Sequence, residues 1–449
     1  MSNLLQSAPK NMLYNLGQVP AIEVQSQLRR FDASITSGFS GSGQNEARIA
    51  IGADGFLDGN KSYLQFKVTA ATASFSIDGT AGSFIDRLEV QSNGRTVWRG
   101  DRYGIYHNVR KYYNSDMADV NKLSCNEGSR GLISQLEGTP AEHDIVKAAL
   151  SGIGEELGIG HSKTYCLDLE CGFFKGDLRK AIPQGASIEL VIRFKPNNAA
   201  IAAHTGAPTW TIDNVRFYAP VYTVQNAEAN NFYNQMLTQG AVMWSGDYIK
   251  TYVNSMGVAS GPAVLQINDR SLSVNAFVTV LREHDADTTL ATLTNSAFVL
   301  GDATGDITSY EYTVAGQPLP SSGRILVDTA VASEDLGRAM EEANKSICDN
   351  GKSHGKLMVD KAAFRSVATD LDANKSSAAK IAKGLICLDL RKMDDMSLKM
   401  KGINTASSAA PNTITIDHAT FATAKDVTTF AVCDATWRLL PNGELEVSV

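Results

Sequence analysis

The sequence has no long apolar run, no N-terminal leader pattern and no excess of basic residues. No stretch approaches 18 consecutive apolar residues, so we expect no membrane-spanning helix. The first residues lack a charged segment followed by an apolar one, so we expect no secretory signal. The formal net charge is −7, which argues against a surface that is basic throughout and binds nucleic acid as a whole.

Cysteine is scarce, and its spacing matches no metal site. The only close pair, Cys166 and Cys171, has four residues between its members, and no second pair completes a zinc site. A chain of this size needs no disulfide to hold its core together. We therefore expect the cysteines to be mostly small buried hydrophobic residues; they stand at positions 125, 166, 171, 348, 387 and 433.

Motifs for phosphate, dinucleotide or calcium binding are present only in broken form. "NGKSHGK" (Asn350–Lys356) lacks the first glycine of a phosphate loop, so we expect a helix end and a loop. "GIGEELGIG" (Gly152–Gly160) has one residue too many for a dinucleotide fingerprint and follows a helical stretch, so we expect a flexible surface loop. "DLDANKS" (Asp370–Ser376) has lysine where a calcium loop needs glycine, so we expect a polar turn.

Catalytic constellations are also missing. No two histidines are spaced as metal ligands on one strand or helix, and no G-x-S-x-G motif provides an exposed serine nucleophile. Asp394 and Asp395 are adjacent and would point to different faces. We predict that the chain is not an enzyme, with no catalytic, metal-binding or cofactor-binding residue and no cofactor. The histidines, expected on the surface or in the core, are His107, His143, His161, His204, His284, His354 and His418.

The composition is that of a folded protein with more than one domain. Hydrophobic residues make up 43% and charged residues 20% of the 449 positions. This length exceeds the roughly 250–300 residues at which single cores stop growing, so we expect about two domains.

An internal repeat supports that expectation. The tetrapeptide "CLDL" occurs at Cys166–Leu169 and again 221 positions later, at Cys387–Leu390. "TIDNVRFYAP" (Thr211–Pro220) and "VCDATWRLLP" (Val432–Pro441) share an aspartate and a proline at the same offset of 221. Gly94 and Gly316 differ by 222, and each stands in a turn between two strand-like runs. We infer a tandem duplication.

Most of the chain reads as short strands with polar, glycine-rich breaks. "YLQFKVTA" (Tyr63–Ala70) alternates apolar and polar residues, and "NAFVTVLR" (Asn275–Arg282) is its rough counterpart. The pattern predicts two β-sandwiches. A few helices are expected, at about Arg102–Tyr113, from Thr139, at about Ala227–Leu237, and at Leu336–Ile347 after an N-cap at Ser333.

Two stretches combine basic and aromatic residues. Arg29–Arg30 and "RYGIYHNVRKYY" (Arg102–Tyr113) would suit a single-stranded nucleic acid. The aromatic residues of the second stretch, however, have near-helical spacing, which favours packing against the sandwich.

The repeat, the polar N-terminus and four segments together resemble the double jelly-roll major capsid proteins. This lineage includes adenovirus hexon, tailless lipid-containing phages, Polinton-like viruses and large eukaryotic DNA viruses. The segments that carry the likeness are "FLDGNKSYLQFKV" (Phe56–Val68), "NDRSLSVNAFVTVLR" (Asn268–Arg282), "ITSYEYTVAGQPLPSSGRI" (Ile307–Ile325) and "CLDLRKMDDMSLKMKGINT" (Cys387–Thr405).

The resemblance implies an all-β fold of two tandem eight-stranded jelly rolls. We expect an N-terminal arm at 1–45, a first jelly roll at 46–224 with an insertion at about 115–165, a linker helix at 225–245 and a second jelly roll at 246–449. It further implies a homotrimer that forms a pseudo-hexagonal capsomer of an icosahedral virion shell. Partners would be other copies, penton and minor capsid proteins, and an internal membrane or the genome through the arm.

Two other classes of protein also duplicate a sandwich. One is the bicupins, which are metal enzymes or storage proteins. An enzymatic bicupin would need histidines and a carboxylate inside a barrel, and the H-x-H pair that usually begins such a site is absent from both halves. A carbohydrate-binding or spike module is compatible with the duplication, but an aromatic content of 8% points to no sugar-stacking platform.

Overall fold

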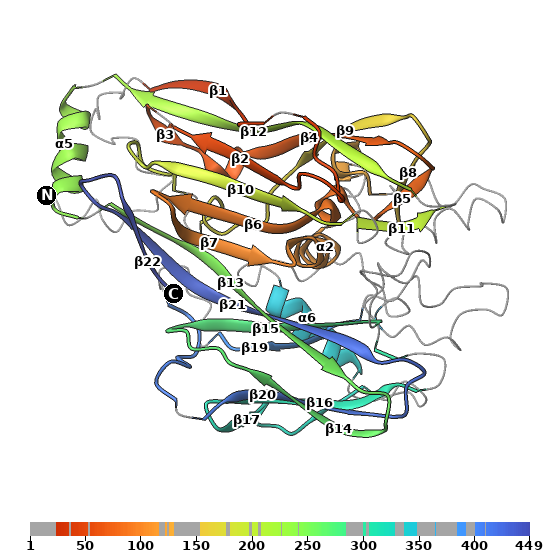
Figure 1. Ribbon diagram of the computed structural model, residues 1–449. Helices are drawn as coiled ribbons and strands as arrows, with labels where there is room; N and C mark the ends of the chain where they lie inside the picture. The colour runs from red at the N-terminus through yellow and green to blue at the C-terminus, as the bar shows by residue number, and fades with distance from the viewer. Residues whose placement is uncertain are drawn as a thin grey trace, which may run out of the picture.

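The computed structural model consists of two β-sandwiches stacked one on the other (Figure 1). We call them the first and the second barrel. None of the helices described is long and apolar enough to cross a membrane. The structure describes residues 24–449 except 36, 53, 116–121, 124, 130–152, 177–179, 197–199, 205–207, 226, 241, 284–299, 302–304, 328–335, 348–363, 365–383, 392–399 and 409.

The first barrel has two large antiparallel sheets. The β1 sheet contains, in spatial order, β1 (Val24–Asp32), β12 (Trp210–Val224), β4 (Tyr63–Ala70) and β9 (Ser162–Leu167), with β3 (Phe56–Leu57) beside β12. The β2 sheet contains β2 (Glu46–Ile51), β10 (Ile188–Phe194), β6 (Ile85–Ser92) and β7 (Arg95–Asp101). A small third sheet is formed by β11 (Ile201–His204), β5 (Phe75–Asp78) and β8 (Ile153–Leu157).

The second barrel repeats the two large sheets. The β13 sheet contains β13 (Met243–Met256), β21 (Lys425–Leu439), β15 (Val274–Glu283) and β19 (Ile386–Asp389), with β22 (Leu445–Ser448) beside β21. The β14 sheet contains β14 (Gly261–Ile267), β20 (Asn412–His418), β16 (Ile307–Val314) and β17 (Gln317–Leu319), with β18 (Ile325–Leu326) beside β16.

The strand order is the same in both barrels. We number from 1 to 8, in chain order, the strands that form the main path of the two large sheets of each barrel, leaving out the short side strands and the small third sheet. Strands 1, 8, 3 and 6 then form one sheet and strands 2, 7, 4 and 5 the other, which is the jelly-roll arrangement. The repeated sequence segments occupy equivalent places. The two CLDL segments lie at the sixth strands, β9 and β19, and the segments that share aspartate and proline lie at the eighth strands, β12 and β21. The all-β double jelly-roll prediction is therefore confirmed.

Alternation of side chains builds each core. On β4 the buried residues are Leu64, Phe66, Val68 and Ala70, while the residues between them are half-buried. The turn between β6 and β7 contains Asn93 and Gly94, both with positive φ. The equivalent turn in the second barrel contains Ala315 and Gly316, again with positive φ, as two-residue hairpin turns require.

Within the described part of the chain, α-helices lie beside the sheets and between the barrels. Helix α2 (Tyr103–Asn114) and helix α6 (Leu336–Ile347) follow the equivalent hairpins β6–β7 and β16–β17, and they contact each other across the two barrels. Helix α5 (Ala227–Thr238) connects the barrels, which confirms the helices expected at these three places. The first barrel also contains two short 3-10 helices, η2 (Gly59–Lys61) and η3 (Ala81–Phe84).

Two expectations need correction. The segment at Gly152–Gly160 is not simply a surface loop, because Ile153–Leu157 forms β8, which pairs with β5 and ends in a tight turn to β9. The second half of the expected N-terminal arm at 1–45 is also part of the first barrel. From Val24 it forms β1, which pairs along its length with β12, and Phe39 is fully buried. Residues 1–23 lie outside the described residues, as do the helix expected from Thr139 and the N-cap at Ser333.

Candidate functional site: the junction of the two barrels

The two barrels are joined by a reciprocal pair of tryptophan hydrogen bonds. Trp98 on β7 of the first barrel donates from Nε1 to the backbone oxygen of Asp247 on β13, at 3.0 Å. Trp437 on β21 of the second barrel donates from Nε1 to the backbone oxygen of Val97 on β7, at 2.9 Å. Both indole rings are fully buried, so each barrel supplies an anchor that the other encloses.

Aromatic packing surrounds these hydrogen bonds. Phe173, which follows β9, lies with its ring centroid 5.5 Å from that of Trp244 and 5.3 Å from that of Trp437, in edge-to-face geometry. On the other side of the junction Tyr106 of α2 lies 5.4 Å from Phe430 of β21. Three of the four tryptophans of the chain therefore take part in the junction.

Glycine lets the backbones of the two barrels approach closely. A Cβ atom added to Gly172 would collide with the backbone nitrogen and oxygen of Asp247, and one added to Gly176 would collide with the backbone oxygen of Ser245. No side chain fits at these two positions, so the segment after β9 lies directly on the backbone of β13.

A buried cluster of charged side chains lies beneath α2. The ammonium nitrogen of Lys111 is 3.0 Å from Glu170 Oε1 and 3.6 Å from Glu127 Oε1. His107, one turn earlier, has its Nε2 atom 2.9 Å from Glu127 Oε2. The backbone N–H of Glu170 donates to the Tyr103 hydroxyl at 2.8 Å. These contacts anchor α2 to the segments around residues 127 and 170.

The cations of the cluster outweigh the effect of burial on its carboxyl groups. Burial alone would raise the pKa of Glu170, but Lys175, then Lys111 and Arg110, hold it well below the ordinary value. Burial would likewise raise the pKa of Glu127, but Lys111 and His107 lower it. For Lys111 burial lowers the pKa and the carboxylates raise it above the ordinary lysine value, so the ammonium and its partners are charged together.

This cluster braces the junction. Its charges are paired with each other, and Arg110 extends it by donating to the backbone oxygen of Ile347 at the end of α6. The cluster thereby fixes α2 against both barrels.

A second group of buried polar side chains lies in the second barrel. Asp434 accepts hydrogen bonds from Ser273 Oγ at 2.6 Å, from Asn275 Nδ2 at 2.6 Å and from the backbone N–H of Lys401 at 2.7 Å. Thr405 donates from Oγ1 to Asp269 Oδ2 at 2.8 Å. The structure thus brings together two segments that carry the resemblance, 268–282 and 387–405.

Sequence reasoning placed some of these residues and missed others. The stretch Arg102–Tyr113 packs against the first barrel as expected, since α2 contacts β6 and η3 and is buried on nearly all sides. His107 and His418 are buried and His161 is exposed, while His143, His284 and His354 lie outside the described residues, and nothing is described of the His204 side chain. The sequence analysis did not predict a role for Trp98, Trp244 and Trp437. The chain has only four tryptophans, and this scarcity could have marked them as candidates for packing contacts.

The cysteines follow the expectation in part. Cys171, Cys387 and Cys433 are buried, and burial raises the pKa of the Cys171 and Cys433 thiols to about 12. Cys166 is half-buried and Cys125 is exposed, whereas Cys348 lies outside the described residues.

Most of the incomplete phosphate- and calcium-binding motifs lie where the structure describes no residues. The segments Asn350–Lys356 and Asp370–Ser376 and the pair Asp394 and Asp395 lie outside the described residues. Within the part of the chain that the structure describes, no three His, Cys, Asp or Glu side chains are placed to hold a metal ion.

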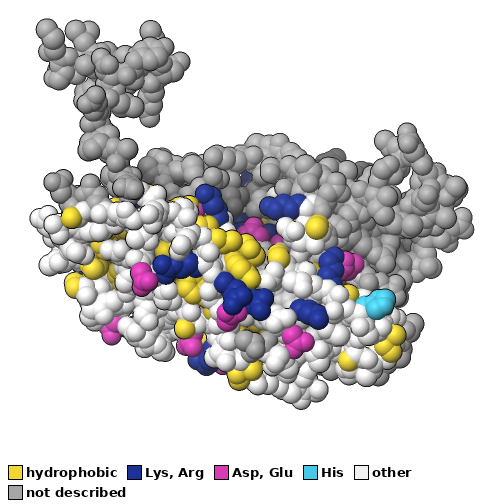
Figure 2. Space-filling model, turned by 90° about the horizontal axis from the view of Figure 1, so that it is seen from above, with side chains coloured by type: hydrophobic (Ala, Val, Ile, Leu, Met, Phe, Trp, Pro, Cys, Tyr) yellow, Lys and Arg dark blue, Asp and Glu magenta, His cyan; other side chains and the backbone are white. Residues whose placement is uncertain are grey.

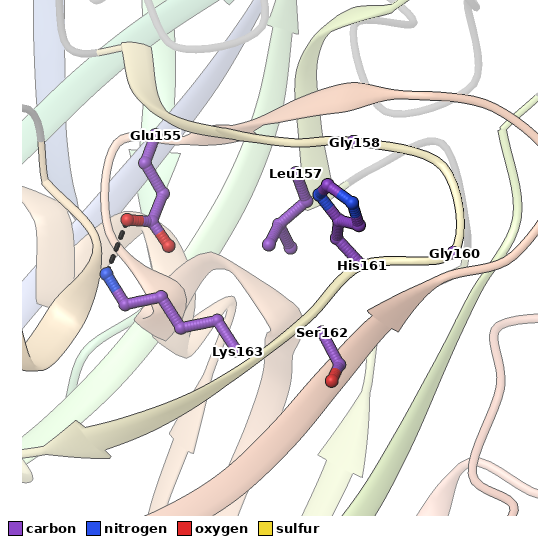
Figure 3. Close-up of a pocket in the computed structure, with 7 residues that line it drawn as sticks. All are labelled: Glu155, Leu157, Gly158, Gly160, His161, Ser162 and Lys163. Atoms are coloured by element: carbon purple, nitrogen blue, oxygen red, sulfur yellow. Dashed lines mark hydrogen bonds and ion pairs between the residues drawn. The ribbon is translucent and has the colours of Figure 1, made fainter.

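A hollow lies at the turn between β8 and β9 (Figure 3). Lys163 makes an ion pair with Glu155 across it, and the Tyr165 hydroxyl donates to Glu155 Oε1 at 2.6 Å. The two charged groups of the hollow therefore neutralise each other. Its lining is Glu155, Leu157, Gly158, Gly160, His161, Ser162 and Lys163.

No protein-family model matches the chain, and no curated protein sequence matches it. Solved structures do resemble it over nearly its whole length. PBCV-1 VP54 aligns with a TM-score of 0.58 at 10% identity, over 95% of this chain and 97% of that chain.

Two further structures align equally far. The Faustovirus major capsid protein has a TM-score of 0.57 at 9% identity, over 97% of this chain and 94% of that chain. The mavirus major capsid protein has a TM-score of 0.53 at 11% identity, over 98% of this chain and 95% of that chain. At such identities the likeness concerns the fold, and it agrees with the strand order: this chain has the double jelly-roll fold of these viral capsid proteins.

Proposed function

We propose that the chain is a major capsid protein, three copies of which form a pseudo-hexagonal capsomer of an icosahedral shell. The observation that carries the proposal is the pair of jelly rolls, alike in strand order and aligned over at least 95% of the chain with capsid proteins. No enzymatic activity is part of this proposal, because the function would reside in contacts between copies.

The junction supports this role physically. Three copies of a two-barrel chain supply six barrels, so a three-fold particle can occupy a position with six neighbours. Such a particle needs the two barrels of each chain held at one fixed angle. The tryptophan pair, the close glycines and the charged cluster beneath α2 together hold that angle.

The partners follow from the same proposal. Other copies would be the main partner, and penton and minor capsid proteins would complete the shell. The chain before β1 would reach from the first barrel toward an internal membrane or the genome, and the protein would reside in the virion.

The solution mass of the purified protein tests the proposal. Three chains of 48.2 kDa give about 145 kDa, which light scattering would detect, and negative-stain images of the same fraction should show hexagonal outlines or shells. A stable round monomer or a two-fold dimer would contradict the proposal. Metal analysis and glycan binding would then test the bicupin and spike alternatives.

A further inference from the structure

The outer edge of strand β14 is left open in the second barrel. β14 stands first in the order β14, β20, β16, β17, so within the described part of the chain it pairs with β20 alone. Figure 1 shows its sheet at the end of the molecule that is farthest from the first barrel. Unpaired strand edges attract other strands, and proteins protect them with charged side chains, with bulges or with cover from their own chain.

Strand β2, which holds the equivalent place in the first barrel, has such protection. It carries Glu46 and Arg48, and the backbone oxygen of Arg48 accepts the N–H of Ser34 at 2.8 Å. Figure 2, which looks onto the first barrel from above, shows charged side chains of both signs among the hydrophobic ones. The first barrel therefore protects its edge by charge and by its own chain.

Strand β14 and the turn that leads into it lack such charges. No charged residue stands between Lys250 and Asp269 in the sequence. In this stretch Val253, Val258 and Val264 are 51%, 44% and 61% exposed. An open strand edge with exposed valines and no charge is typical of a surface that another chain covers.

The backbone of β14 directs its free groups outward at every second residue. The backbone oxygen of Gln266 accepts Nδ2 of Asn254 on β13, in the other sheet, at 3.1 Å, so it points away from β20. Asp417 stands opposite Pro262 in register, and its backbone oxygen accepts a hydroxyl group of β16 at 3.1 Å instead. The backbone groups of Pro262, Val264 and Gln266 therefore point away from β20.

We propose that the β14 edges of two copies pair antiparallel with each other across a two-fold axis at Val264. The N–H of Val264 in each copy donates to the Val264 oxygen of the other, and the N–H of Gln266 donates to the Pro262 oxygen of the other. Proline has no N–H, and the acceptor opposite its nitrogen is the Gln266 oxygen, which Asn254 already fills. The donors and acceptors of this edge thus match those of a second copy of itself.

The absence of charge suits a contact of this symmetry. At a two-fold axis a residue meets its own copy, so a charged residue there would face a like charge. A two-fold axis cannot belong to the three-fold ring of one capsomer, so the contact joins copies that lie in different capsomers. Under the proposed function, on which this inference rests, β14 is one edge by which capsomers meet.

Disulfide trapping tests the two-fold register. Concentrated full-length protein carrying Val264→Cys in a Cys125→Ser background would be oxidised and run on a non-reducing gel. We expect covalent dimers, because the Cα atoms of a hydrogen-bonded antiparallel pair are about 5.5 Å apart, a distance that a disulfide spans.

The matched control is Pro262→Cys in the same background. Residue 262 is exposed on the same face of β14 as residue 264. In the proposed register, however, its two copies would lie about 14 Å apart, too far for a disulfide, so we expect no dimer. If Val264→Cys gives no more dimer than Pro262→Cys, the inference is overturned.

Assembly tests the same contact without a cross-link. Val264→Pro removes an outward N–H and no hydrogen bond to β20, so we expect the trimer of about 145 kDa to persist while larger particles are lost. Val264→Thr keeps the N–H and should assemble as the wild-type protein does. Light scattering and negative-stain images of both variants measure this.

Two results of the assembly test would overturn the inference and leave the proposed function standing. In one, Val264→Pro assembles as fully as Val264→Thr. In the other, Val264→Pro blocks assembly but Val264→Cys gives no covalent dimer, which would mean that a different protein occupies the edge. If the wild-type protein is a monomer at every concentration, the inference and the proposed function both fail.

Discussion

Trp98 and Trp437 show how single side chains unite two domains. The two residues are 339 positions apart in the chain, and each donates to a backbone oxygen of the opposite barrel. A buried indole contributes a large apolar area and one directional hydrogen bond. Tryptophan therefore contributes both apolar burial, which holds the barrels together, and a directional hydrogen bond, which fixes how they are oriented.

At this scale Asp434 provides a sharp prediction. Replacing it with alanine would leave Ser273 Oγ, Asn275 Nδ2 and the Lys401 N–H without their common acceptor in a buried place. Unsatisfied buried donors cost about 1–3 kcal/mol each to leave unpaired, so we expect Asp434→Ala to lower the free energy of unfolding by about 2–4 kcal/mol. Urea unfolding measures this.

The control for this variant is Asp54→Ala. Asp54 pairs with Arg29 at the surface, and its side chain is 90% exposed. Its loss should cost less than about 1 kcal/mol. Equal losses in the two variants would show that the hydrogen bonds of Asp434 do not stabilise the second barrel.

At the scale of elements, the segment after β9 and helix α2 hold the barrels in place. We expect Gly172→Ala to lower the free energy of unfolding by at least about 2 kcal/mol, because its Cβ would collide with the backbone of Asp247 and force the barrels apart. The matched substitution Gly337→Ala lies on the exposed side of α6 with open space around it, and it should leave stability unchanged or raise it by up to about 1 kcal/mol. Denaturant unfolding of the two variants side by side checks this, and a neutral Gly172→Ala would contradict the close approach.

The charged cluster beneath α2 predicts a loss of stability in acid. The pKa values of Glu127 and Glu170 are lower in the folded protein than the ordinary value of 4.5, so unfolding in acid takes up protons. Their contribution is fully present above about pH 4.5 and is lost as the pH falls through the lower folded values. We expect Glu170→Gln to reduce the slope of unfolding free energy against pH between about pH 5 and 3. Urea midpoints over this range measure the slope, and an unchanged slope would be evidence against the charged state of Glu170.

At the scale of the whole molecule, the barrels depend on one another. Separating them would expose apolar side chains of the second barrel that now contact aromatic rings of the first, among them Trp244, Tyr248 and Phe430. We therefore expect a fragment of residues 241–449 to aggregate or bind a hydrophobic dye, whereas the full chain remains dispersed. A monodisperse fragment with native near-ultraviolet dichroism would show instead that the second barrel is an independent domain.

The sequence by itself determined the repeat and the strand pattern. Period-two alternation at Tyr63–Ala70 and the near-constant offset of 221 are local or self-similar signals, and they led to the double jelly roll. The domain limits 1–45, 46–224, 225–245 and 246–449 stay predictions.

Only the tertiary structure decided which surfaces are covered. Strand β8 looked like a loop because its partner, β5, lies about 80 positions earlier in the chain. The junction was invisible because Val97 and Trp437 meet only after both barrels have formed, and Gly172 carries no side-chain signal at all. Burial on the faces between the barrels depends on which element of the other barrel packs there. The alternation of apolar and polar residues along a strand indicates only which face of its own sheet is turned to the core.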